Sequence, residues 1–205
     1  MTTSKNLLLL ACAVLFAGSV VTTSASTFTV VGANRTASLT NAIDGDMGSG
    51  NPNAADIAAE LGLSSWVSRG NIAGASGTSA GGSDDLFTVT LTSGSWGGGD
   101  AAGTWAISSS FWATYGNAAI SMHLGNGGGN PDHFSFLVDP NPATRLSGTW
   151  SYDLVTGTGG GLSNLRLWGT GAPRNDTPGV PDGGVTVAML GLALAAVGLA
   201  RRFSR

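Results

Sequence analysis

Hydrophobic and polar residues alternate with a period of two over much of the chain between Thr27 and Trp168, and glycines interrupt the alternation. Phe87 and Val89 alternate with threonines, for example, and Trp150 alternates with small polar residues. This period is typical of strands that bury one face. The pattern predicts short strands over residues 28–31, 87–92, 104–109, 118–124, 133–138, 149–154 and 164–168.

One segment has helical spacing instead. Asn51 is the expected N-cap, Pro52 the expected first helical residue, and Gly62 the expected terminator. The apolar residues between them recur every three or four positions, at Ala54, Ile57, Ala58 and Leu61. We expect a short amphipathic helix whose apolar face lies on a sheet.

These elements predict a mainly β fold, a β-sandwich or jelly-roll-like exported domain with one short helix, over residues 26–168. A Gly/Pro-rich linker is predicted over residues 169–179. The triplet Gly-Thr-Trp occurs at residues 103–105 and again at 148–150. Two copies are too few for a repeat architecture, so we interpret them as two strands that each bury a tryptophan.

The first 25 residues have the order of a secretory signal peptide. Lys5 precedes an apolar run from Leu7 to Val21, and small residues follow as far as Ala25. We expect signal peptidase to cleave after Ala25. A first transmembrane helix is the alternative, although the small residues and the polar, glycine-rich sequence that follows favour cleavage.

The only cysteine, Cys12, lies inside that apolar run, so the mature protein is expected to contain no thiol, disulfide or cysteine-ligated metal. Leu9-Leu10-Ala11-Cys12 resembles a lipoprotein cleavage box, and a lipid on Cys12 would anchor the protein from its other end. The apolar run continues past the cysteine, which favours the ordinary signal peptide.

A tripartite tail, residues 180–205, ends the printed sequence. It consists of the motif Val180, Pro181, Asp182, Gly183, Gly184, an apolar run from Val185 to Ala200, and a basic cluster of Arg201, Arg202 and Arg205. Sixteen helical residues span about 24 Å, which is short for a hydrocarbon core of about 30 Å. We predict a transmembrane helix over 185–200, with the arginines on the cytoplasmic side. The run is apolar on every face, which argues against an amphipathic core helix.

This tail resembles the PEP-CTERM class of exosortase sorting signals, and Val180–Gly184 is closest to the VPDSG variant. Gly183-Gly184 replaces the Ser-Gly of that variant. The resemblance implies that a membrane-embedded exosortase cuts near the motif and releases the domain or transfers it to another surface component. The protein would then be a membrane-anchored precursor that reaches the cell surface or the extracellular space.

Charge and composition limit the function further. Residues 26–182 contain no lysine and carry five basic and twelve acidic side chains, a net charge of −7. An acidic domain does not favour nucleic-acid binding, and the lack of lysine excludes Schiff-base chemistry and a P-loop. The expected partners are therefore signal peptidase, an exosortase-type enzyme, the membrane, and as a further candidate a surface polysaccharide.

The two histidines are the clearest candidates for catalysis or metal binding. Matching the apolar faces of their strands pairs His123 with Ser135 and places His133 diagonally from His123, roughly 7–8 Å away. With Asp132 nearby, a metal is conceivable, but solvent-facing side chains beside a glycine-rich loop are the favoured interpretation. We predict no metal, cofactor or catalytic residue.

Other acidic and aromatic residues supply weaker candidates. Asp44-Gly45-Asp46 begins like a calcium loop, but the later EF-hand ligands are missing. Asp84-Asp85 is interpreted as an exposed acidic turn. Glu60, the only glutamate, is placed on the solvent side of the short helix. Four tryptophans either stack on sugar rings or, by default, pack in the core: Trp66, Trp96, Trp112 and Trp168.

We therefore predict a noncatalytic surface or extracellular-matrix protein that is sorted through its tail. A secreted carbohydrate-binding module is the first alternative, based on the tryptophans and the sandwich. A secreted hydrolase that uses His123 or His133 with an aspartate is the second.

Overall fold

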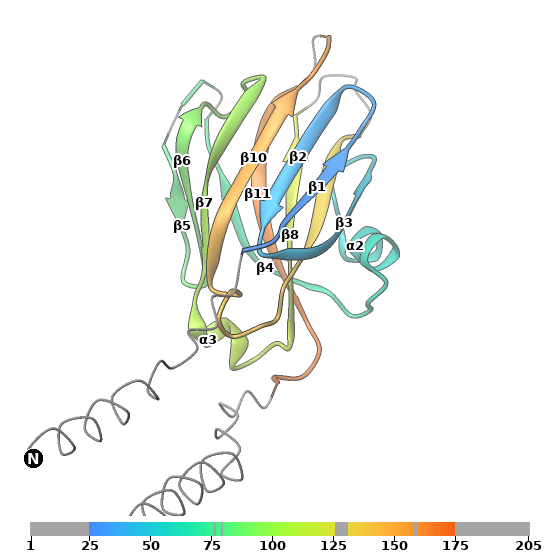
Figure 1. Ribbon diagram of the computed structural model, residues 1–205, viewed down its shortest axis with the longest axis vertical. Coiled ribbons are helices and arrows are strands. Elements are labelled where there is room, and N and C mark those ends of the chain that lie inside the picture. Colours follow the sequence, from blue (N-terminus) through green and yellow to red (C-terminus); the bar gives the residue numbers. More distant parts are fainter. Residues whose placement is uncertain (1–24, 76, 79, 126–130, 158–159, 175–205) are drawn as a thin grey trace, which may run out of the picture.

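The computed structural model describes residues 25–75, 77–78, 80–125, 131–157 and 160–174. Two antiparallel sheets face each other, as Figure 1 shows. Buried side chains form a continuous core between them. The prediction of a mainly β sandwich is confirmed. The expected signal peptide up to Ser24, residues 175–179 of the linker, and the tail over 180–205 lie outside the described residues. Within them, no helix is both long and apolar enough to cross a membrane.

The first sheet has the strand order β1-β2-β10-β7-β6-β5. Its strands are β1 (Thr27–Val31), β2 (Arg35–Thr40), β5 (Gly82–Ser83), β6 (Phe87–Gly94), β7 (Asp100–Ile107) and β10 (Ser147–Leu154).

The second sheet has the order β3-β9-β8-β11-β4. Its strands are β3 (Ala42–Gly48), β4 (Val67–Ala73), β8 (Asn117–Leu124), β9 (His133–Val138) and β11 (Leu162–Thr170). All seven strands expected from alternation are present. β11 ends at Thr170, two residues beyond the expected end of the domain at Trp168.

Four strands were not predicted: β2, β3, β4 and β5. In β4 only Gly70 and Ile72 are buried, and in β3 only Ala42, so neither strand shows a clear apolar alternation. A short second helix, α3 (Ser109–Trp112), was also not predicted. The strand that we predicted over 104–109 ends at Ile107, and α3 begins two residues later. β3, β4 and β5 are edge strands and α3 is a connection, where packing against neighbours decides the conformation, whereas β2 lies inside the first sheet between β1 and β10.

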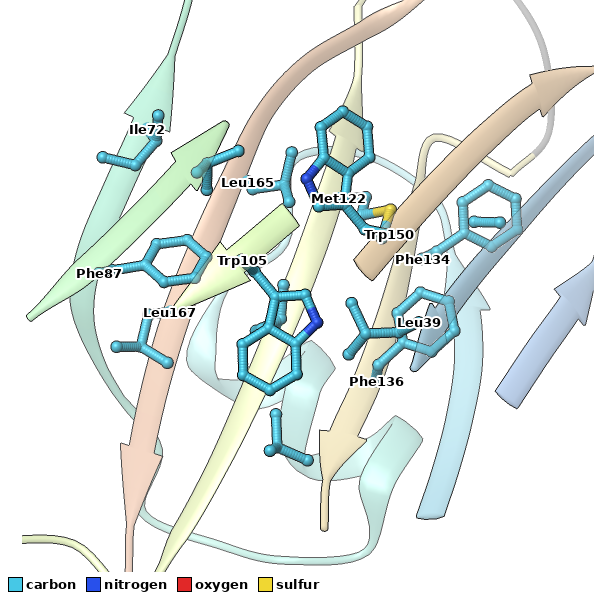
Figure 2. Packing of buried hydrophobic residues seen from close by; sticks show 14 of the residues in the cluster. Leu39, Ile72, Phe87, Trp105, Met122, Phe134, Phe136, Trp150, Leu165 and Leu167 are labelled. Carbon is cyan, nitrogen blue, oxygen red and sulfur yellow. The ribbon is translucent and has the colours of Figure 1, made fainter. Parts of the chain in front are cut away.

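The core between the sheets is formed by the alternating inward side chains of both layers. Figure 2 shows Trp105 and Trp150 of the first sheet among the aliphatic and aromatic side chains of the second. The fully buried side chains on the second sheet include Phe134 and Phe136 of β9 and Leu165 of β11. The period-two pattern therefore marks the residues that join the two layers.

The two Gly-Thr-Trp triplets lie directly opposite each other on β7 and β10. Gly103 is opposite Trp150, and Gly148 is opposite Trp105. Both tryptophans are buried, as predicted, with exposed fractions of 1% and 2%. A side chain on either glycine would collide with the indole of the facing triplet. Each glycine therefore leaves room for the partner triplet's tryptophan.

Helix α2 (Ala54–Leu61) is present where we expected a helix, and Gly62 ends it with a left-handed φ of 70°. The N-cap is Asn53 rather than Asn51. Asn53 accepts hydrogen bonds from the backbone of Ala55 and Asp56, and the Asp56 side chain accepts one from the Asn53 backbone in return. This reciprocal capping box stabilises the helix start two residues later than predicted.

α2 packs on the outer face of the second sheet, not between the sheets. Ile57 and Leu61 form a smaller core there with Trp66, Ala119 and Trp168. The second sheet is therefore buried on both faces where α2 lies.

Candidate functional site

The two histidines are direct cross-strand partners on the outer face of the second sheet. His123 of β8 is opposite His133 of β9, and Ser121 is opposite Ser135. The predicted pairing of His123 with Ser135 is wrong by two residues. A shift of two residues keeps every side chain on its face, so alternation alone does not distinguish the two registers. The observed register continues at the end of β8, where the Leu124 N–H donates to the Asp132 carbonyl oxygen at 2.8 Å.

His133 is completely buried, which contradicts its predicted solvent-facing position. Its Nε2 lies 2.7 Å from Glu60 Oε1, and its Nδ1 lies 3.0 Å from the Gly50 carbonyl oxygen. Glu60 was placed on the solvent side of the helix, but α2 directs it toward β9 and leaves its side chain only 10% exposed. Both ring nitrogens of His133 therefore hold α2 and the preceding loop against the sheet.

The surroundings of His133 favour its protonated form. Burial by itself lowers the pKa of the imidazole, but the hydrogen bond and charge of Glu60 oppose this. The Gly50 carbonyl and the charge of Asp56 act in the same direction as Glu60, and the pKa of His133 is raised above its usual value. His133 and Glu60 thus form a buried ion pair whenever the imidazole is protonated.

His123 is in a different environment. Its Nδ1 lies 2.8 Å from Ser163 Oγ, and this hydroxyl also donates to the His123 carbonyl oxygen at 3.0 Å. Burial, then the nearby charges of His133 and Arg166, lower the pKa of His123, while Asp132 opposes them. A serine beside a neutral imidazole is the start of a nucleophilic site, but none of the hydrogen bonds that orient His123 comes from a carboxylate. Among the residues that the structure describes, no third group of a catalytic triad joins this pair.

The acidic residues serve local structure. Asp44 and Asp46 lie on β3, and each carboxylate accepts a hydrogen bond from the next residue's N–H. Asp84 accepts hydrogen bonds from the backbone of Leu86 and Phe87 and so forms the turn before β6. Among the described residues there is no group of three or more histidine, cysteine, aspartate or glutamate side chains arranged to hold a metal ion.

The four tryptophans proposed for sugar stacking are all buried, with exposed fractions of 1–4%. Trp96 and Trp112 belong to the core between the sheets, whereas Trp66 and Trp168 lie beneath α2. Trp168 Nε1 also donates to Ser121 Oγ at 2.8 Å. Core packing is therefore confirmed for all four, and none offers a free aromatic face.

The outer face of the first sheet carries a feature that sequence inspection missed. Five threonines form one row across β1, β2, β10, β7 and β6. Thr27 is opposite Thr40, Thr149 is opposite Thr104, and Thr104 is opposite Thr90. A hydrogen bond joins the row between β2 and β10, where the Thr149 N–H donates to Thr40 Oγ1 at 2.6 Å. Each threonine alternates with buried or half-buried residues in its own strand, as the period-two pattern indicates, but only the strand order brings the five together.

A shallow depression of about 370 Å³ lies over this row and the next one. Its lining is uncharged and rich in hydroxyl groups, with Thr27, Ser38, Thr40, Thr92, Ala102, Gly103, Thr149, Trp150 and Ser151. Some hydroxyls are already engaged, as between Thr29 and Ser38 at 2.9 Å. The nearest acidic residues on this face, Asp100 and Asp153, are opposite each other at the end of the β7–β10 ladder.

The comparison that bears on function concerns the tail and not these surfaces. The model of the VPDSG-CTERM motif matches residues 179–202. The chain carries a VPDSG-CTERM motif. The match covers Val180–Gly184, the apolar run and the first two arginines of the basic cluster, in the order expected from the resemblance. No curated protein and no solved structure matches the chain.

The VPDSG-CTERM motif is consistent with an exported, surface-directed protein that is sorted through its tail. The last described residues show where the sandwich ends relative to this motif. Thr170 Oγ1 donates to the Ser64 carbonyl oxygen at 2.6 Å, and Arg174 donates to the Gly116 carbonyl oxygen and to Asn117 Oδ1, both at 2.9 Å. The first part of the predicted linker is therefore attached to the domain as far as Arg174.

Proposed function

We propose that the protein is a noncatalytic exported surface or extracellular-matrix protein that an exosortase-type membrane enzyme sorts and processes through its tail. The VPDSG-CTERM match over residues 179–202 is the observation that carries this proposal. Val180–Gly184 is the recognition sequence, Val185–Ala200 holds it at the membrane, and Arg201, Arg202 and Arg205 stay on the cytoplasmic side.

Physical arguments support an accessible recognition sequence. Pro181 has no N–H to donate, and two glycines follow Asp182, so this stretch does not favour continuing a helix above the membrane. Residues 175–184 separate the attached Arg174 from the apolar run, and they contain two prolines and no large aromatic residue. A membrane-embedded enzyme could reach such a stretch without unfolding the sandwich.

The noncatalytic part rests on the histidines. Both nitrogens of His133 are used to hold α2, and His123 has a serine neighbour without an orienting carboxylate. Loss of an activity of the purified protein in both His123→Ala and His133→Ala would favour the hydrolase alternative instead.

The tail is tested with a C-terminal tag and immunoblots of membrane and medium fractions. We expect a longer membrane-bound precursor and a shorter product without the tag. Replacing Pro181 and Asp182 by alanine should block processing but leave insertion intact, because the apolar run and the arginines are unchanged. Asp176→Ala with Pro178→Ala is the matched control, just upstream of the motif, and should be processed normally.

Changing Arg201, Arg202 and Arg205 to glutamate should disturb retention and topology instead, because the positive charge that stops transfer is removed. If the mature wild-type protein keeps its C-terminal tag, the tail is a plain anchor and the sorting proposal fails.

A second candidate function, binding of a neutral surface polysaccharide, is favoured by the threonine face. An extended, uncharged surface of hydroxyl groups can exchange hydrogen bonds with sugar hydroxyls without desolvating a charge. The depression over Thr40 and Thr149 gives such a polymer a place to lie. This replaces the tryptophans as the basis for carbohydrate binding.

Glycan-array binding of the exported protein tests this candidate. Thr149→Arg places a long side chain inside the depression and should abolish binding. Thr88→Arg lies on the same face outside the depression and should bind like wild type. Equal loss in both variants, or no binding by wild type, would exclude the depression as a carbohydrate site.

A further inference from the structure

A sandwich with open sheets has edge strands, and this protein protects three of its four edges. β5 is only two residues long. β4 contains a bulge at Arg69, which has no partner in the ladder with β11. β3 contains a bulge at Ile43 and carries Asp44 and Asp46. Short length, bulges and charged residues are the usual devices that prevent an edge from pairing with another chain.

The fourth edge, β1, has none of these devices. Its sequence, Thr-Phe-Thr-Val-Val, has no charge, no proline and no glycine. Its register with β2 is regular from Thr27 to Val31, without a bulge. Among the described strands β1 pairs with β2 alone, so one side of its backbone has no ladder partner. The free backbone groups of such an edge strand can form hydrogen bonds with a strand of another chain.

Exposed apolar side chains gather at the same side of the sandwich. Val31 on β1 is 67% exposed, and Ile43 and Met47 on β3 are 51% and 39% exposed. β1 and β3 belong to different sheets but are neighbours, because a side chain at Gly45 would lie 3.0 Å from Val30 and 3.1 Å from Phe28. Figure 1 shows both strands on one side of the molecule. Half of the large exposed hydrophobic residues of the described chain therefore border this open edge.

We propose that β1 pairs antiparallel with β1 of a second copy of this chain and joins the two first sheets into one. Full overlap of the five residues centres the two-fold axis on Thr29, with Phe28 opposite Val30 of the other copy. This register keeps Phe28 and Val30 on the inner face in both copies and Thr29 on the outer face. Val31 then lies opposite the other copy's Thr27, so part of its exposed apolar surface is covered.

A second copy fits this edge because antiparallel pairing of identical neutral strands brings no like charges into direct contact. The remaining opposition comes from the net charge of −7 on residues 26–182 of each copy, and it acts over a distance. Salt screens such repulsion, with a Debye length of about 10 Å at 0.1 M. The association should therefore strengthen as the salt concentration rises, unlike one based on ion pairs.

Disulfide trapping in the full chain, extracted in detergent, tests the register. In a Cys12→Ser background, Thr29→Cys provides the only thiol and places it opposite its own copy. Antiparallel partners have Cα atoms about 4.5–5.5 Å apart, within the range that a disulfide spans. We expect rapid formation of a covalent dimer on mild oxidation. Thr149→Cys is the control, because Thr149 is exposed in the middle of the outer face of the first sheet, away from the β1 edge. It detects cross-links between copies that merely share a detergent micelle.

Analytical ultracentrifugation gives the second readout. The wild-type chain should form dimers, and more of them in 0.5 M than in 0.05 M salt, because the Debye length is longer than about 10 Å at the lower concentration and shorter than that at the higher one. Thr29→Lys adds an edge charge and should give monomers, whereas Thr88→Lys should behave like wild type. The proposal is overturned if wild type stays monomeric at both salt concentrations, if Thr149→Cys cross-links as readily as Thr29→Cys, or if Thr29→Lys leaves the dimer unchanged.

Discussion

At the scale of single residues, function and stability depend on side chains that face each other from distant parts of the sequence. Gly148 and Trp105 are one such pair, and Glu60 and His133 are another. In each pair, neither residue type alone reveals its role. The first pair depends on close packing, and the second depends on the charge of the carboxylate beside the imidazole.

The first prediction concerns Gly148. A Cβ atom at this position would lie 2.5 Å from Thr40 Oγ1 and 2.8 Å from ring atoms of Trp105. Gly148→Ala should lower the free energy of unfolding by about 1–3 kcal/mol, as overpacking of a core does. Gly99→Ala is the control, since its nearest atoms would be 3.7 Å away, on Leu154. Urea denaturation of both variants measures the difference, and an unchanged Gly148→Ala would contradict the packing described.

The second prediction concerns the His133–Glu60 pair. Because the folded state raises the pKa of His133, the pair contributes stability that is fully present below the unfolded pKa of about 6.5 and is lost as pH rises through the folded pKa. Glu60→Gln removes the charge but keeps a hydrogen-bonding group. The difference in unfolding free energy between wild type and Glu60→Gln should therefore be larger near pH 6, where the imidazole is protonated, than near pH 9.

The lowered pKa of His123 gives the opposite trend, since its contribution grows as pH rises. This trend is common to wild type and Glu60→Gln, so to first order it cancels in the difference between them. A gap that is constant with pH, or larger near pH 9, would show that Glu60 does not stabilise the protonated imidazole.

At the scale of elements, α2 is the part of the fold whose start is most sharply defined. Its capping box begins at Asn53, while Asn51 is exposed two residues earlier. Asn53→Ala should lower the free energy of unfolding by about 1 kcal/mol, the usual effect of losing an N-cap. Asn51→Ala should change it by less than about 0.5 kcal/mol, as an exposed substitution does. Thermal melts of the two variants distinguish the caps, and a larger loss in Asn51→Ala would place the cap where the sequence suggested.

At the scale of the whole molecule, the sandwich extends to Arg174 and not only to the last apolar strand residue. Removing residues 169–174 deletes the last two residues of β11, which pair with β4 and β8, together with the hydrogen bonds of Thr170 with Ser64 and of Arg174 with Gly116 and Asn117. We expect residues 25–174 to unfold in one cooperative transition with a β-type circular dichroism spectrum. Residues 25–168 should melt lower, by about 2–4 °C for each kcal/mol lost in a domain of this size. Equal melting temperatures would mean that these contacts contribute nothing.

Features that depend on neighbouring residues along the chain could be predicted from the amino-acid sequence. Strands such as β6 and β10 were predictable because each buries one face, and period-two alternation is a local property of the chain. The helix was predictable from Ile57, Leu61 and the terminating Gly62. The tail was recognisable because its motif, apolar run and arginines follow one another in order, so no fold is needed to bring them together.

Contacts between distant residues depend on the three-dimensional arrangement of the strands and could not be predicted in this way. The His123–His133 register could not be read from the sequence, because a two-residue shift leaves the alternation unchanged. Glu60 was wrongly placed in solvent because α2 packs on the outer face of the second sheet. The sequence of the helix alone does not show that this sheet is buried on both faces. The threonine row and the open edge of β1 depend on strand order, since hydrogen bonds between strands join residues more than a hundred positions apart, as between Thr40 and Thr149.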